Sequence, residues 1–244
     1  MDVKDIFNPE TLNIFTDASI KTIKETNETL GCPGAICVGT NLNGSTYIID
    51  EAYFIERHAT NNSSEIKAVS LGISKALQYR NNFKYINLFS DSMICIHGLR
   101  EWLYNWLRCI YNGTMYSSSG KPVANQQTFA SILNTIVMNN LYINLYHQKG
   151  HVSVINNDSL INAANVFKKT NFIQDDVSLD LISLISGYNN MVDIRTGEQL
   201  ENFVSRPIPY CNKFNKDSLV MGFDMVHFNV EKYKELTYNK IIGR

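Results

Sequence analysis

Leu12-Asn13-Ile14-Phe15-Thr16-Asp17 is a short apolar run that ends on a carboxylate, and Tyr85-Ile86-Asn87-Leu88-Phe89-Ser90-Asp91 repeats this arrangement later in the chain. Short apolar runs of this length are typical of buried strands. Strand ends gather at one edge of a parallel or mixed sheet, and sites form there. Two strands that each end on an acid therefore predict both a sheet and a candidate site at its edge.

The segments around these strands predict a mixed sheet with helices on its faces. Between Ser63 and Tyr79, apolar residues recur at intervals of three and four, which indicates an amphipathic helix. Three strands, a helix, a strand, two helices, a strand and a helix follow one another, an order typical of an α/β or α+β layer fold. The other expected strands are 35–39, 45–55 and 141–146, the other helices are 93–110, 126–138, 158–168 and 175–186, and 20–30 is expected to be a loop.

Length and composition limit the classes of protein. The 244 residues fit one large domain, or one domain of about 150 residues with an extension. The 22 basic residues balance 23 acidic ones, which excludes a bulk basic nucleic-acid coat and an acidic solvating tail. With 44% hydrophobic and 11% aromatic residues, the chain can bury a core.

The sequence also bears on the compartment. No run approaches the roughly 20 apolar residues that span a bilayer, and the first residues are acidic where a signal peptide is basic and then apolar. The five cysteines form no Cys-x-x-Cys pair, which argues against a disulfide scaffold and a thiolate zinc site. We therefore expect a cytoplasmic protein in a reducing environment, without membrane contact.

Four acids are expected to share the sheet edge: Asp17, Asp91, Glu65 near the start of the first helix, and Asp158 at the start of a later one. Crowded carboxylates raise one another's pKa values, and hard divalent cations relieve that repulsion. Two Mg²⁺ or Mn²⁺ ions about 4 Å apart can activate a water and stabilise the leaving oxygen of a phosphodiester. Taken singly, each acid also fits an ordinary turn, helix cap or first helical turn.

Six motifs in this order resemble the ribonuclease H type 1 family, over about residues 10–170. They are Thr16-Asp17-Ala18-Ser19, Thr60-Asn61-Asn62-Ser63-Ser64-Glu65, Ser90-Asp91-Ser92, the pair Gly98–Trp106 and Gly120–Asn125, Lys149-Gly150-His151, and Asp158-Ser159-Leu160 with Ala163-Ala164. The fourth resembles the helix pair that is called the basic protrusion in this family. One such motif would be weak, whereas six in order are specific.

The resemblance implies a ribonuclease H-like mixed five-stranded sheet flanked by helices over residues 10–170. Residues 171–244 would form a partly helical C-terminal extension whose role is open. The implied activity is endonucleolytic hydrolysis of the RNA strand of RNA–DNA hybrids with two Mg²⁺ ions, or Mn²⁺, leaving 5′-phosphate and 3′-hydroxyl ends. We expect a monomer whose extension packs on the main domain or on a protein partner.

The resemblance also assigns roles. Asp17 would bridge both metals, Glu65 and Asp91 would complete the leaving-group side, Asp158 would hold the metal that activates the attacking water, and His151 would assist water positioning or product release. The implied nucleic-acid contacts are Thr60 on a DNA phosphate, Asn61 and Asn62 on the RNA minor groove with its 2′-hydroxyls, and Ser92, Trp102, Trp106 and Lys121. Two tryptophans one turn apart on a helix more often pack in a core than bind nucleic acid, so one of the two is expected to be the contact.

Three departures from the family pattern stand out. The segment between Asp17 and Gly31 is long, Met93 stands where Gln is common, and the loop from His151 to Asp158 is short. Two alternatives remain open at this point. One is a nucleic-acid-binding module that has lost efficient turnover, and the other is a DNA-cleaving relative on the same fold. The Thr-Asn-Asn-x-x-Glu run argues against the second, because its amides serve ribose recognition.

Overall fold

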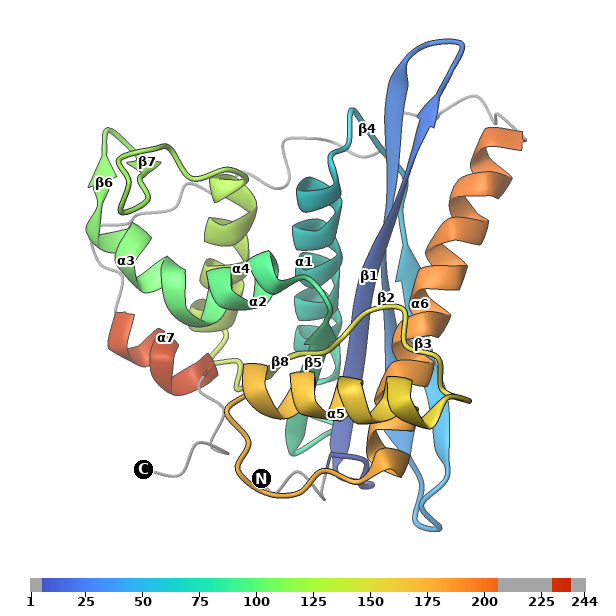
Figure 1. The fold of residues 1–244 in the computed structure, drawn as a ribbon. Helices are drawn as coiled ribbons and strands as arrows, with labels where there is room; N and C mark the ends of the chain where they lie inside the picture. Colours follow the sequence, from blue (N-terminus) through green and yellow to red (C-terminus); the bar gives the residue numbers. More distant parts are fainter. Residues whose placement is uncertain (1–5, 206–229, 238–244) are drawn as a thin grey trace.

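A mixed sheet forms the centre of the computed structural model, which describes residues 6–205 and 230–237 (Figure 1). Antiparallel pairing joins the first three strands, and the last two run parallel to the first. The order is β3-β2-β1-β5-β8, with β1 at Thr11–Ile23, β2 at Glu28–Thr40, β3 at Thr46–Tyr53, β5 at Tyr85–Ser90 and β8 at Asn144–His147; the short β4 (Glu56–Arg57) also pairs with β2. The predicted mixed five-stranded sheet flanked by helices is confirmed.

Helices cover both faces of this sheet. Alternate residues of β1 point to opposite faces, so that Ile14 packs beneath α1 whereas Phe15 packs beneath α6. The helices are α1 (Asn61–Tyr79), α2 (Met93–His97), the π-helical η2 (Gly98–Trp102), α3 (Leu103–Arg108), α4 (Gln126–Met138), α5 (Asn157–Thr170), α6 (Leu179–Ser205) and α7 (Val230–Thr237). Within the described ranges, none is both long and apolar enough to cross a membrane.

Two expectations about local structure are corrected. Residues 20–30 are not a loop, because β1 and β2 continue as a long hairpin whose tip is at Asn27, a residue with φ of 53°. β-Branched residues, which favour strands, occur along this part of the hairpin. Thr22 and Thr29 hydrogen-bond across it at 3.1 Å. The single helix expected at 93–110 is divided by the π-helical turn η2. A small hairpin, β6 (Ile110–Tyr111) and β7 (Thr114–Met115), follows it.

The C-terminal region departs most from expectation. The helix expected at 175–186 is the much longer α6, which lies along β1 and β2 (Figure 1). Its side chains Ile182, Ile185 and Val192 are buried in the same apolar cluster as Phe15 and Ile36 of the sheet. Helix α6, which follows the boundary expected at residue 170, thus forms part of the core on this face.

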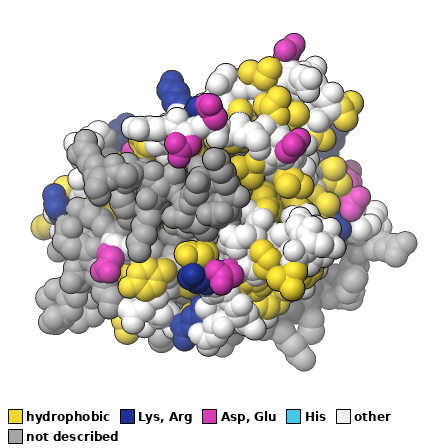
Figure 2. All heavy atoms as spheres, turned by 90° about the horizontal axis from the view of Figure 1, so that it is seen from below, with side chains coloured by type: hydrophobic (Ala, Val, Ile, Leu, Met, Phe, Trp, Pro, Cys, Tyr) yellow, Lys and Arg dark blue, Asp and Glu magenta, His cyan; other side chains and the backbone are white. Residues whose placement is uncertain are grey.

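Pro207 and Pro209 predict irregular segments near the C-terminal end of the sequence, and they lie outside the described residues. Helix α7 packs on the α4 side of the sheet, where Tyr233 and Leu236 are buried. The Tyr233 hydroxyl donates to the carbonyl of Leu99 at 3.0 Å. On the face shown in Figure 2, the described residues present hydrophobic patches and only scattered charged side chains, in keeping with a chain of 18% charged residues.

Candidate metal centre

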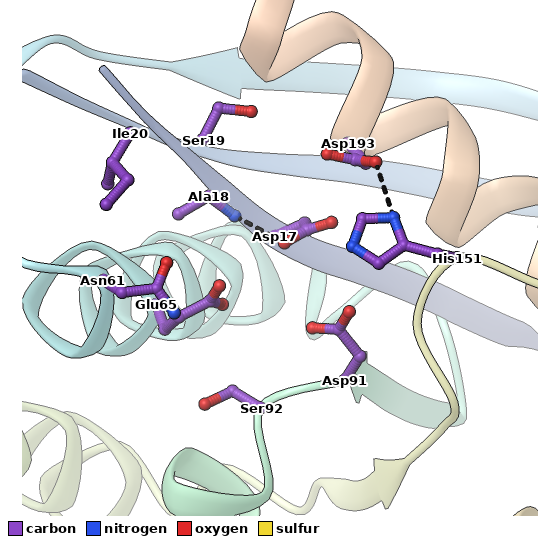
Figure 3. Close-up of a pocket in the computed structure, with 10 residues that line it drawn as sticks. All are labelled: Asp17, Ala18, Ser19, Ile20, Asn61, Glu65, Asp91, Ser92, His151 and Asp193. Atoms are coloured by element: carbon purple, nitrogen blue, oxygen red, sulfur yellow. Dashed lines mark hydrogen bonds and ion pairs between the residues drawn. The ribbon is translucent and has the colours of Figure 1, made fainter. Parts of the chain in front are cut away.

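Three acidic side chains converge at the edge of the sheet. Asp17 lies on β1, Asp91 directly follows β5, and Glu65 projects from the start of α1 (Figure 3). One carboxylate oxygen from each lies within 4.8 Å of the others. The register explains this, because Thr16 of β1 pairs with Ser90 of the parallel strand β5 and the next residues emerge side by side.

Helix α1 lies close enough to β1 to bring Glu65 into this group. Its N-terminus is fixed by a capping box, in which Thr60 Oγ1 accepts from the Ser63 N–H at 3.1 Å and Ser63 Oγ accepts from the Thr60 N–H at 2.9 Å. Two turns beyond Glu65, Gly72 permits the close approach: a Cβ there would lie only 2.7 Å from Thr16 Cγ2. The capped start of α1 and the close contact at Gly72 together place the Glu65 side chain beside Asp17 and Asp91.

The electrostatics of the group favour a cation. Burial, and after it the charge of Asp91, raises the pKa of Asp17 to about 8, although the Ala18 N–H donates to Asp17 Oδ1 at 2.7 Å. Burial, and after it Asp17, raises the pKa of Glu65 to about 9, and burial also raises that of Asp91. Among the described residues, the buried Glu65 Oε2 has no hydrogen-bond partner. Clustered carboxylate oxygens with an unpartnered buried atom fit a hard divalent cation.

Asp158 does not join this group. Asp158 lies exposed in the first turn of α5. The N-cap of this helix is Asn156, whose Oδ1 accepts a hydrogen bond from the Ser159 N–H at 3.0 Å. The loop after His151 is short, and α5 begins after it with its first turn facing solvent. An acid in this first turn interacts favourably with the helix dipole. Of the four acids expected at the edge, the structure thus brings together Asp17, Glu65 and Asp91.

The fourth acid beside the pocket is Asp193 of α6. It lines the same pocket, of about 360 Å³, and its charge contributes to the raised pKa values of Asp17, Glu65 and Asp91. The sequence did not predict a role for Asp193, because the apolar pattern of α6 is interrupted around this residue. A signal was nevertheless present: Asn189 and Thr196 are buried polar residues on the stripe that also buries Val192.

The loop after β8 closes the pocket from the other side. His151 Nδ1 lies 3.3 Å from Asp193 Oδ2, and its ring is largely exposed (Figure 3). A Cβ on Gly150 would overlap the Asp91 carboxylate, so glycine is required for the backbone to pass this close. Asn61 and Ser92 also line the pocket, and Ser92 caps α2.

A second hollow, of about 220 Å³, lies between α1 and the η2–α3–α4 helices. Asn62, Trp102 and Trp106 line it. Trp102 is 39% exposed, whereas Trp106 is partly buried with its ring edge-on to Phe129 at 5.1 Å. Lys121 is exposed and lies outside both linings, and Thr60 is exposed at the start of α1.

Comparisons with known proteins agree with this arrangement. Residues 9–165 match the sequence model of the RNase H family. The chain is 32% identical over 145 residues to ribonuclease HI of Haemophilus influenzae, covering 59% of this chain and 80% of that protein. It is 29% identical over 166 residues to ribonuclease HI of Pasteurella multocida, covering 67% and 94%.

Among solved structures, the RNase H domain of PFV matches with a TM-score of 0.46 at 16% identity, covering 65% of this chain and 92% of that one. LC9-RNase H1, described as a type 1 RNase H with the type 2 active-site motif, matches with a TM-score of 0.47 at 16% identity, covering 67% and 74%.

The fold and the acidic site define a nucleic-acid-binding hydrolase of the nuclease class. The chain belongs to the ribonuclease H family, and it is a ribonuclease H enzyme. The family match ends at residue 165, before α6, so Asp193 lies outside the matched region.

Proposed function

We propose that this enzyme hydrolyses the RNA strand of RNA–DNA hybrids with two divalent cations, Mg²⁺ foremost, and leaves 5′-phosphate and 3′-hydroxyl ends. The observation that carries the proposal is the set of three carboxylates within 4.8 Å, of which Glu65 keeps a buried oxygen unpartnered among the described residues. Family membership supports it, since the motifs around Asp17, Glu65 and Asp91 are those of ribonuclease H.

Asp17, Glu65 and Asp91 would hold the cations, with Asp193 in place of Asp158 as the fourth carboxylate. When bound, the cations would activate the attacking water and stabilise the leaving oxygen of the phosphodiester. Asp17 is suited to the shared position, because its neighbours Glu65 and Asp91 approach it from two different elements.

His151 would accept and release a proton beside this centre. Its Nδ1 faces Asp193 Oδ2, so the neutral ring keeps its proton on Nδ1 and leaves Nε2 as the acceptor. The ring is exposed and lines the pocket, so Nε2 can take a proton there and release it to solvent. His151 would in this way assist the positioning of water or the release of product.

The two hollows suggest how a hybrid would lie. Asn61 lines the metal pocket and Asn62 lines the second hollow, so the start of α1 separates the two. The RNA strand would cross the first hollow, where Asn61 and Ser92 can reach ribose hydroxyls. The DNA strand would follow Asn62 and the exposed Trp102, whose ring offers a stacking surface; Thr60 and Lys121 would contact phosphates.

Hybrid affinity should be moderate and sensitive to salt. One of the basic residues near the second hollow is already engaged, since Arg100 donates to Asn171 Oδ1 at 3.0 Å and lies over the Phe172 ring.

The test compares cleavage of an RNA–DNA hybrid, duplex DNA and duplex RNA in Mg²⁺ under one condition. Asp17→Asn should abolish hybrid cleavage; unchanged cleavage in that variant would show that the assigned chemistry is wrong. Asp193→Asn and Asp158→Asn form a matched pair, since both remove an α-helical acid. We expect a loss of about 10²-fold for Asp193→Asn and near wild-type activity for Asp158→Asn.

The opposite ranking would restore Asp158 as the fourth acid. Binding of the hybrid without cleavage by the wild-type chain would favour a binding module. Preferential cleavage of duplex DNA would favour a DNA-cutting relative.

A further inference from the structure

Asn189 is a fully buried amide behind the residues that line the candidate metal centre. It lies on α6 one turn before Asp193, so the two side chains share a face of the helix. Only 1% of Asn189 is exposed. Burying an amide without partners is costly, so its contacts should be specific.

Its contacts place it between β8 and the acid at the end of β5. Gln148 Nε2 donates to Asn189 Oδ1 at 2.5 Å, and Gln148 is itself only 2% exposed. The Asn189 side chain also lies close enough to the Asp91 carboxylate to lower the pKa of that group. Because the bond from Gln148 occupies the amide oxygen, the amide nitrogen of Asn189 is left to face the carboxylate, which when ionised only accepts.

The position of Asp91 makes such support necessary. Asp91 follows the last residue of β5, and the backbone of Gly150 passes directly against its carboxylate. Gln148 continues the pairing of β8 with β5, since its N–H donates to the Ser90 carbonyl at 3.1 Å. The ends of two strands and the middle of α6 thus meet at this one side chain.

We propose that Asn189 is a positioning residue that orients the Asp91 carboxylate for metal binding, with Gln148 setting the direction of its amide. This inference rests on the proposed metal-dependent function. It assigns α6 a second contribution to the site besides Asp193. Partners of a ligating carboxylate that do not touch the metal typically change metal affinity by about 10- to 100-fold when they are removed.

Asn87 offers a matched control for the loss of a buried amide. It is fully buried on β5, its Nδ2 donates to Asn13 Oδ1 at 2.9 Å, and its Oδ1 accepts from Asn144 Nδ2 at 3.0 Å. It therefore has the same residue type and burial as Asn189, and its oxygen likewise accepts from a side-chain amide, but it lies in the sheet, four residues before Asp91. Asn189→Ala and Asn87→Ala should cost similar stability.

The experiment measures Mg²⁺ binding by isothermal titration calorimetry on the full chain without substrate, alongside hybrid cleavage as a function of Mg²⁺ concentration. We expect the Mg²⁺ Kd to rise about tenfold in Asn189→Ala and to stay near the wild-type value in Asn87→Ala. Gln148→Met keeps the volume but removes the donor, and it should raise the Kd in the same direction by a smaller factor. This variant keeps the test decisive if Asn189→Ala does not fold.

The outcomes separate the two proposals. If the wild-type chain binds Mg²⁺ and cleaves hybrid but Asn189→Ala weakens binding no more than Asn87→Ala does, the positioning role is overturned and the function stands. An unchanged Kd in Gln148→Met overturns the part assigned to Gln148. If the wild-type chain neither binds Mg²⁺ nor cleaves hybrid, the proposed function itself fails.

Discussion

Neutralising Asp17 should stabilise the metal-free protein at alkaline pH, although it should abolish activity. In the unfolded chain the carboxyl groups of Asp17 and Glu65 release their protons near pH 4, whereas in the folded protein their pKa values are about 8 and about 9. Between these limits the folded state binds more protons, so the free energy of unfolding falls as pH rises. Asp17→Asn removes one of the two groups responsible.

The size of the effect follows from the geometry. The carboxylate oxygens lie within 4.8 Å of one another, and two unit charges at that limit repel by about 3.5 kcal/mol at an effective dielectric constant of 20. The asparagine can keep the bond from the Ala18 N–H, but its amide still loses hydration on burial, which offsets part of this gain. We therefore expect Asp17→Asn to add about 2 kcal/mol to the free energy of unfolding at pH 8.5 without metal, and clearly less at pH 4.5. For a domain of this size, that corresponds to a Tm increase of about 4 to 8 °C.

Thermal unfolding in EDTA at pH 4.5, 7 and 8.5 would measure this. Asp158→Asn is the control, because its exposed acid in the first turn of α5 should give no gain at any of these pH values. Added Mg²⁺ should raise the wild-type Tm and reduce or reverse the difference between the two proteins. An equal decrease in the Tm of Asp17→Asn at pH 4.5 and 8.5 would refute the reasoning.

Three further predictions concern other parts of the molecule. Gly150→Ala should lower hybrid cleavage about 10²-fold with little change in Tm, because the added Cβ displaces Asp91; Gly187→Ala, with open space around it, is the kinetic control. Trp102→Ala should weaken hybrid binding by about 1 to 3 kcal/mol in a binding titration, whereas Trp106→Ala should instead destabilise the fold by about 3 kcal/mol in urea unfolding; the reverse pattern would exchange their roles. Truncation after residue 172 removes α6 and uncovers Phe15 and Ile36, so the product should aggregate or bind a hydrophobic dye; a soluble, active product would contradict the place of α6 in the core.

The sequence predicted the sheet and three of the acids well, for a physical reason. Asp17 and Asp91 each follow an apolar strand, and neighbouring parallel strands must bring such residues together. Glu65 is positioned by a helix whose start is marked by its own capping residues. In these cases the information is local and survives in a short window of sequence.

The other features of the site and of the fold depend on contacts between residues far apart in the sequence, which a local sequence pattern does not reveal. Asp158 in the first turn of a helix and an acid at a site look alike in sequence, and only the direction of α5 separates them. Asp193 lies in a stretch of α6 where Gly187, Asn189 and Asn190 weaken both helix propensity and apolar periodicity. The β1–β2 hairpin was missed because its exposed half is held by backbone pairing rather than by apolar alternation.

The course of α6 along β1 bears on how the protein reaches its active form during synthesis. Ser19 and Thr196 hydrogen-bond at 2.9 Å across 177 residues of chain. A growing chain holds Asp17, Glu65 and Asp91 long before Asp193 leaves the ribosome, and the sheet face that receives α6 stays uncovered in that interval. Contacts between such distant segments form slowly. With Asp193 as the proposed fourth carboxylate, the acidic site is completed only when α6 closes this face of the core, and a chain that ends before α6 lacks that acid.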